Sequence, residues 1–479
     1  MDLARTQRYL PWLVATALFM EQLDSTIVNT GIPSMAASLG VTPLSLKAVA
    51  TSYILALAVS IPVSGWLADR FGSRRIFLFA LAMFTLSSVM CGLAPNASLL
   101  VASRVPQGIS AAMMMPVGRS AVVRTFPKSE LLRVMNFIII PALIGPLLGP
   151  TVGGLIVHWL NWRVMFFVNV PVGLVGLWLA RKVMPDYRVA DPPPLDVVGL
   201  VLFASGVALL SWLLEVFGEH TVPAFQVTLL FLLSAALLAA YGWHATQVPF
   251  PLLRLQVFKV RTFRISVLGG FVTRLGIGGL PFLLPLLYQL GLGLPAWESG
   301  LLMMPAAASA MFMKVMSASL LRRFGYRQVL VANTVLVACG IACYALVGPG
   351  TWLGAIIGLG SMLGLFNSLQ FSSLNTMAYA DIEPDDASMA STIASTLQQM
   401  SLSFGLAMAT LVTSFFLAEL PQSDHVAVTR ALHHGYLMMA TLTLLSSLAF
   451  RGLRKNDGES VSKGAAARDA DESRHSELA

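Results

Sequence analysis

The chain has 479 residues, of which 56% are hydrophobic and only 11% are charged, and its mean hydropathy is +0.75. A soluble domain carries about a quarter charged residues to keep its surface hydrated, so this composition excludes an ordinary soluble protein and requires that most of the surface faces lipid. The formal net charge of +8 would suggest a nucleic-acid partner only in a soluble protein, and we expect none here.

Apolar runs long enough to cross a membrane recur along almost the whole chain. A spanning α-helix needs about 20 mainly apolar residues. The runs of this length lie at residues 10–32, 48–68, 76–94, 98–120, 134–157, 163–183, 195–217, 223–244, 265–290, 299–318, 327–347, 351–374, 389–417 and 431–451. The sequence therefore predicts an all-α integral membrane protein with fourteen transmembrane helices.

Basic residues are distributed unevenly between the loops on the two sides of the membrane. An even number of spans places both termini on one side, and the loops of that side hold most of the arginines and lysines. The opposite loops hold only Lys47, Arg163 and Arg430. Because cytoplasmic loops carry the Lys/Arg excess, we predict a multi-pass protein of the inner (cytoplasmic) membrane with both termini in the cytoplasm.

The first predicted helix carries a polar arc, formed by Glu21, Gln22, Asp24, Ser25, Thr26 and Asn29. At about 100° per residue these positions cover about half of the circumference, so we expect them to face a cavity, with Gln22 and Asn29 as candidate substrate contacts. Ionisable groups inside a membrane are costly and are functional candidates. Burial and mutual repulsion favour the protonated form of at least one carboxyl group near neutral pH. We predict Asp24 as the proton carrier and Glu21 as a second candidate, while a purely structural role stays open.

The loop after the second span is repeated later in the chain. Its candidate switch residues are Gly65, Asp69, Arg70, Gly72 and Arg74. The series Leu67, Arg70, Phe71, Gly72 and Arg74 recurs 253 residues later as Leu320, Arg323, Phe324, Gly325 and Arg327. We expect Asp69 to bind a helix N-terminus or a basic residue of the other half in one access state, and a solvated loop acid is the alternative.

This repeat predicts two related halves. We expect an N-terminal six-helix bundle at residues 1–190, two additional helices at 191–248, a C-terminal six-helix bundle at 249–451 and a disordered cytoplasmic tail at 452–479. Transporters built from two such halves place the substrate site at their interface. Because both halves lie in one chain, we expect a monomer to be functional.

One arginine, Arg104, lies inside the fourth span, away from the basic loops. A permanently charged guanidinium inside a membrane needs a buried acceptor or water. Our hypothesis is that Arg104 shifts the protonation of a carboxyl group in the first half as the cavity switches. An internal structural ion pair is the alternative.

The fifth span contains a stripe of glycines at positions i, i+4 and i+8, with prolines between them. The segment comprises Gly145, Pro146, Gly149, Pro150, Gly153 and Gly154. Missing side chains let two backbones approach closely, and the prolines remove hydrogen-bond donors and allow bends. We predict a close-packed seam that opens and closes, and simple helix packing is the compatible alternative.

Two further cations lie inside predicted spans of the second half, Arg274 in the ninth and Lys314 late in the tenth. Such groups are unusual in a site devoted to cations. They could pair with acids, Lys314 could extend to the cytoplasmic surface, or both could attract an anionic substrate. We keep both as candidate substrate contacts.

No motif indicates a cofactor or a metal. Cys91, Cys339 and Cys343 lie inside apolar runs with no histidine or acid nearby, so we expect buried, apolar thiols and no metal site. The chain also lacks a glycine-rich phosphate-binding loop of the ATPase kind. This argues against direct use of ATP.

Four segments, in this order, resemble motifs of the major facilitator superfamily, specifically its fourteen-helix drug:proton antiporter branch of the multidrug efflux type. They are residues 23–33 of the first span, 65–75 after the second, 104–108 of the fourth and 145–154 of the fifth. The resemblance implies antiport, links Asp24 and Arg104 to proton transfer, and assigns leak prevention to the fifth-span segment. Two departures are Pro106 inside the fourth-span motif and Arg322 where the first loop copy has Asp69.

We therefore expect a proton-coupled antiporter that exports small lipophilic compounds by alternating access, and not an enzyme. Its expected partners are a small-molecule substrate, protons and membrane lipid. An exporter of an anionic metabolite is the first alternative, and a non-transporting membrane sensor or scaffold is the second.

Overall fold

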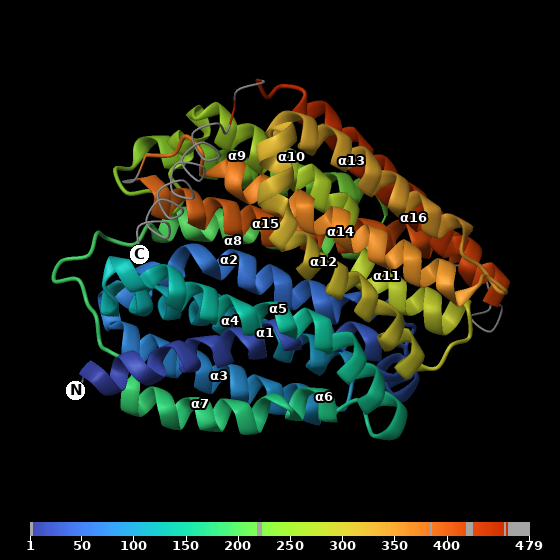
Figure 1. Ribbon diagram of the computed structural model, residues 1–479, viewed down its shortest axis with the longest axis horizontal. Helices are drawn as coiled ribbons and strands as arrows, with labels where there is room; N and C mark the ends of the chain where they lie inside the picture. Colours follow the sequence, from blue (N-terminus) through green and yellow to red (C-terminus); the bar gives the residue numbers. More distant parts are fainter. Residues whose placement is uncertain (1–2, 218–222, 384–385, 418–424, 455–456, 458–479) are drawn as a thin grey trace, which may run out of the picture.

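The computed structural model describes residues 3–217, 223–383, 386–417, 425–454 and 457, and within these residues every regular element is helical (Figure 1). The first nine helices are α1 (Leu3–Leu39), α2 (Lys47–Phe71), α3 (Ser73–Leu93), α4 (Ala97–Thr125), α5 (Lys128–Trp159), α6 (Val164–Phe167), α7 (Asn169–Val183), α8 (Val197–Phe217) and α9 (Ala224–Gln247). After the short helix η1 (Leu255–Lys259) follow α10 (Arg261–Ile277), α11 (Leu280–Leu286), η2 (Leu287–Gly291), α12 (Ala296–Phe324), α13 (Tyr326–Cys343), η3 (Tyr344–Leu346), α14 (Leu353–Ala378), α15 (Ala387–Leu417) and α16 (His425–Phe450).

Each of the fourteen expected spans coincides with one long helix or with an interrupted one, such as α6–α7 or α10–α11–η2. Among the described residues, ten of these are long and apolar enough to cross a membrane by length and composition alone. The others are α1, α4, α5 and α16. Polar groups lower the hydropathy of α1, which carries Glu21 and Asp24, and of α4, which carries Arg104 and Arg119. The all-α membrane fold is confirmed.

Figure 1 shows α1–α7 in the lower half of the view and α10–α16 in the upper half, with α8 and α9 beside the upper group. Helix α8 packs against α9 and also touches α2 and α15. Between the two groups, α5 packs on α12 and α2 packs on α15. The expected domain boundaries stay a prediction, and most of the expected tail at 452–479 lies outside the described residues.

The repeated glycine of the two loops has a conformational cause. Gly72 ends α2 with φ 96°, and Gly325 ends α12 with φ 74°. Residues with a side chain rarely adopt positive φ, so glycine is favoured where the chain leaves one helix and immediately begins the next. The sequence repeat therefore corresponds to the same tight turn in both halves.

Asp196, which precedes the span Val197–Leu214, forms hydrogen bonds that connect the two additional helices α8 and α9 at one end. Its carboxylate accepts hydrogen bonds from the backbone N–H groups of Gly199 and Leu252, at 2.7 and 3.1 Å, and lies 2.7 Å from Nε2 of His244 on α9. Burial opposes ionisation, but the bonds from His244, Gly199 and Leu252 outweigh it, so the pKa of Asp196 is lowered. Asp196 thus ties α8, α9 and the following segment together.

The expectation for the cysteines is partly wrong. Cys91 is buried, as expected, whereas Cys339 and Cys343 are exposed on α13. Cys339 and Cys343 are four residues apart and therefore share one helix face. This face of α13 points away from the packed interior.

Candidate functional site

The Asp24 carboxylate on α1 lies at the centre of a buried polar network. It accepts hydrogen bonds from Arg104 Nη1 at 2.5 Å, from Asn169 Nδ2 at 2.7 Å and from Gln107 Nε2 at 3.0 Å. A buried charge is tolerated when it is paired and when its remaining lone pairs accept hydrogen bonds. The charged form of Asp24 is well accommodated here by α4 and α7.

Arg104 has acceptors for most of its guanidinium group. Its Nε donates to the Val49 carbonyl at 3.0 Å, and its Nη1 donates to Gln107 Oε1 at 2.7 Å as well as to Asp24. The guanidinium also lies over the Tyr53 ring, 4.2 Å from the centroid. The buried acceptor of Arg104 is Asp24, a carboxylate of the first half, and the effect of Arg104 on protonation stays a prediction.

Three members of the network were not predicted as site residues, although one of them, Gln107, lies in the fourth-span motif. Gln107 and Asn169 both donate to Ser88 Oγ on α3, at 2.8 and 3.3 Å, in addition to Asp24. Gln107 could have been found, because it lies three residues after Arg104 and therefore on the same face of the helix. No signal marks Asn169 or Ser88, since neutral polar residues are common in membrane helices.

Glu21 differs from Asp24 although it lies one turn away on the same helix. It is only 5% exposed, and its Oε2 atom is buried without a hydrogen-bond partner. The charges of Arg119 on α4 and of Asp24 act electrostatically on the Glu21 carboxyl group. A buried carboxylate oxygen without a donor is unfavourable, so the geometry accommodates a neutral Glu21 better than a charged one.

The glycine stripe of α5 packs on the polar arc of α1. A Cβ atom at Gly145 would lie 2.8 Å from Cβ of Gln22, and one at Gly153 would lie 2.5 Å from the carbonyl oxygen of Ile27. Gly149 faces Thr26 in the same way. The expected close packing is present, against another helix of the same sequence half, and the opening and closing of this seam stays a prediction.

A second seam on α5 joins the two sequence halves. Gly154 faces the Ala296 carbonyl on α12, and Gly300 on α12 faces the Pro150 carbonyl. The Thr151 hydroxyl on α5 donates to the Gly300 carbonyl at 3.2 Å. A further bond between the halves joins η2 to α1, where Gln289 Nε2 donates to the Thr30 carbonyl at 2.9 Å. Glycine on both sides allows the backbones of α5 and α12 to touch.

The loop after α2 contacts its own half. Asp69 pairs with Arg124 of α4 at 3.0 Å, and both side chains are more than a third exposed. Arg74 donates to the Arg181 carbonyl, and Arg70 is exposed. Among the described residues Asp69 pairs within its own half, and the contact with the other half that we expect in one access state stays a prediction.

Of the four candidate substrate contacts, two lie on α1 in the first half, and the other two lie on α10 and α12 in the second half. Gln22 is half-buried against Gly145, and the Asn29 amide donates to the Ser25 carbonyl at 3.5 Å. Arg274 is half-buried on α10, with its guanidinium 5.6 Å from the centroid of the Phe371 ring, whereas Lys314 on α12 is exposed.

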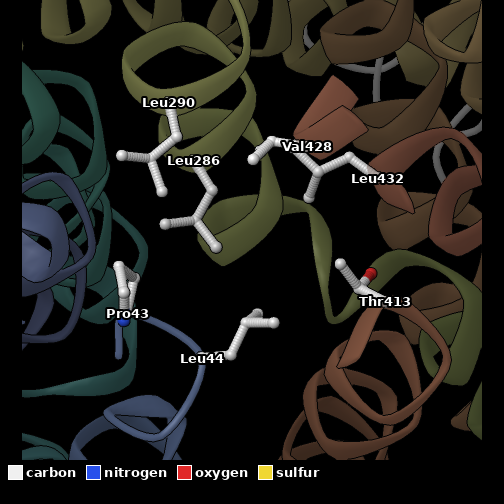
Figure 2. A pocket seen from close by; sticks show the side chains of 7 residues that line it. All are labelled: Pro43, Leu44, Leu286, Leu290, Thr413, Val428 and Leu432. Atoms are coloured by element: carbon white, nitrogen blue, oxygen red, sulfur yellow. The ribbon is translucent and has the colours of Figure 1, made fainter. Parts of the chain in front are cut away.

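Figure 2 shows a small apolar pocket lined by Pro43, Leu44, Leu286, Leu290, Thr413, Val428 and Leu432. Thr413 is the one side chain with a polar atom in this lining. The pocket shares no residue with the Asp24 network, and it offers little for the recognition of a polar or charged group.

Comparisons with known proteins place this geometry in context. The family model described as Major Facilitator Superfamily matches residues 14–406. A protein of Serratia proteamaculans (strain 568) named multidrug resistance protein MdtD is 38% identical over 439 residues, which cover 92% of each chain. A Klebsiella pneumoniae (strain 342) protein of the same name is 37% identical over 449 residues, covering 94% of this chain and 95% of the relative.

Solved structures agree in fold. An auto-inhibited POT family peptide transporter superposes with a TM-score of 0.69 at 17% identity, covering 94% of this chain and 98% of the other. A D-xylose–proton symporter superposes with a TM-score of 0.65 at 15% identity, with the same coverage of 94% and 98%. At such identities the likeness shows the fold alone.

Proposed function

The chain belongs to the major facilitator superfamily, and on this premise we propose that it exports small, partly apolar molecules in exchange for protons. It is a membrane transporter and not an enzyme. The observation that carries the proposal is the buried Asp24–Arg104 pair inside the membrane. The relatives named multidrug resistance proteins support drug-like compounds as the cargo.

The coupling follows from what a proton would do to the Asp24 network. A proton on Asp24 removes the charge that balances Arg104, and it turns one acceptor oxygen into a donor. While Asp24 is ionised, moving Arg104 away leaves a buried charge without its partner, which costs about 3–5 kcal/mol. Protonation of Asp24 removes this cost. Arg104 can then move to other acceptors or to water. Proton binding and a change of conformation are thereby linked.

Alternating access needs a contact between the halves that can open. The α5–α12 seam at Gly154 and Gly300 is our candidate for this gate, because its few side chains and carbonyl contacts can separate without exposing a large apolar core. With both termini in the cytoplasm, as the basic loops favour, this seam lies on the outer side of the inner membrane. A single chain supplies both halves, so we propose a functional monomer.

Flux measurements in proteoliposomes test the proposal. Native protein, Asp24→Asn and the control Glu130→Gln, which removes an exposed acid at the start of α5, are compared with a panel of drug-like compounds under an imposed pH gradient. We expect uphill transport by the native protein and the control, and none by Asp24→Asn. Correctly folded protein without flux of any compound would favour the sensor or scaffold alternative.

A further inference from the structure

Three basic side chains outside the Asp24 network are linked electrostatically, directly or through a shared neighbour, across the two sequence halves. They are Arg119 on α4, Arg274 on α10 and Lys314 on α12. Arg119 and Lys314 repel each other electrostatically, and Arg119 and Arg274 both interact with Tyr379 at the end of α14. The first half thus contributes one cation to this cluster and the second half two.

The cluster has too few acids to balance it. Among the described residues, none of these three side chains forms a hydrogen bond or an ion pair. The acid that acts on the cluster is Glu21, through Arg119. Arg274 is half-buried, whereas Arg119 and Lys314 are exposed. All three lie inside predicted spans, where cations mark sites for charged ligands or ions. Three cations opposite one carboxyl group leave at least two positive charges to be neutralised.

The surroundings of Arg274 indicate what kind of ligand fits. Its Nη1 atom lies over Gly270, where a Cβ atom would be only 2.9 Å away, and Leu374 borders the same spot. The Phe371 ring faces the guanidinium group. Gly270 therefore leaves room for the guanidinium beside an aromatic and an aliphatic surface, an arrangement suited to a ligand with an anionic group and an apolar body.

We propose that Arg119, Arg274 and Lys314 bind the negatively charged group of the exported substrate, which makes amphipathic organic carboxylates or sulfonates the substrate class. This inference rests on the proposed function. Arginine presents a planar fork of N–H donors that matches a carboxylate or sulfonate, and ligands from both halves join the substrate to the moving parts of the transporter.

The charge of the substrate has a measurable consequence. Exchange of one monovalent anion leaving for one proton entering moves two positive charge equivalents inward. Exchange of one monovalent cation for one proton moves none. An inside-negative membrane potential therefore accelerates the export of an anion, and it leaves one-for-one cation exchange unchanged.

The test uses purified full-length protein in phosphatidylcholine vesicles without anionic lipid. Two fluorescent anions, carboxyfluorescein and pyrenesulfonate, are compared with two cations, ethidium and rhodamine 6G. The variants are Arg274→Gln and Arg274→Lys, with Arg264→Gln as the control, since Arg264 is an exposed cation on the same helix outside the cluster. Size-exclusion profiles establish that each variant is folded.

We expect saturable anion flux that rises with the membrane potential, falls about tenfold in Arg274→Gln and is partly restored in Arg274→Lys. Flux of cations alone, or anion flux equal in Arg274→Gln and Arg264→Gln, overturns the anion site while leaving the proposed exporter intact. Flux of no compound refutes the exporter itself.

A lipid phosphate could use the same cations, so the assay is repeated with vesicles that contain phosphatidylglycerol. Competition between this lipid and the anionic dyes in the native protein supports a site for the substrate anion. If Arg274→Gln changes only the response to phosphatidylglycerol and not the dye flux, the cluster is a lipid site and the proposal is wrong.

Discussion

Arg104 Nη1 and Asp24 Oδ2 are 2.5 Å apart, and their side chains are only 1% and 0% exposed. The Asp69–Arg124 pair, by contrast, is exposed by 37% and 38%. Exposed pairs contribute about 0–1 kcal/mol, whereas removing one partner of a buried pair costs about 3–5 kcal/mol. The two pairs therefore have different consequences when they are broken.

The buried pair predicts a strong dependence of each partner on the other. Arg104→Gln leaves the Asp24 charge uncompensated, and we expect it to destabilise the protein by about 3–5 kcal/mol. The double variant with Asp24→Asn removes both charges and should recover much of that loss. Thermal unfolding in detergent measures the stability of the single variant and of the double variant. A double variant less stable than Arg104→Gln would contradict the pairing.

The α1–α5 seam predicts a steric effect. A Cβ atom at Gly153 meets the Ile27 carbonyl at 2.5 Å, so Gly153→Ala forces the two backbones apart and should cost about 1–3 kcal/mol. The control is Gly242→Ala on α9, where nothing lies within 4 Å, and where alanine should be neutral or slightly stabilising. Equal unfolding temperatures of the two variants would show that the seam is not tight.

The α5–α12 seam predicts a change of access. Gly300→Leu places a bulky side chain against the backbone at Pro150 and Thr151, and we expect it to hold the halves apart at this end. Hydrogen exchange of residues 150–159 and 296–300 should then be faster, and uphill transport should be lost. Gly358→Leu is the matched control, since Gly358 has open space around it. Unchanged exchange in Gly300→Leu would exclude the seam as the gate.

Asp196 predicts a dependence of stability on pH. Its pKa is lower in the folded protein than in the unfolded chain, so its stabilising effect is complete above the unfolded value of about 3.9 and is lost as the pH falls through the lower folded value. We expect Asp196→Asn to lower the unfolding temperature at pH 7 and to lower it by less at pH 3. An equal effect at both values would show that the charge of Asp196 is irrelevant.

The sequence was sufficient to place the fourteen spans, because long apolar runs remain recognisable even where polar groups lower the hydropathy, as in α1 and α4. It also identified Asp24 and Arg104, because charges within apolar runs are rare. It did not identify Asn169 or Ser88, since neutral polar residues carry no such signal. The spacing of Gly145, Gly149 and Gly153 indicated a close contact, but spacing on one helix cannot say which helix packs there.

The partner that Asp69 has in this structure was not predicted, for a related reason. Its place in the loop motif suggested the other half, whereas the structure gives Arg124 of its own half. Contacts between distant segments depend on tertiary packing, and a single sequence contains little information about them. The same holds for the α5–α12 seam, where Gly154 faces Ala296, 142 positions later in the chain, and Gly300 faces Pro150, 150 positions earlier.

Direct measurement of proton release tests the coupling most sharply. Purified protein in weakly buffered detergent is mixed with the compound that gives the largest flux, and a pH indicator follows the protons released on binding. We predict release by the native protein and by Glu130→Gln, and none by Asp24→Asn with binding retained. Equal release by Asp24→Asn and the native protein would contradict a coupling role of Asp24.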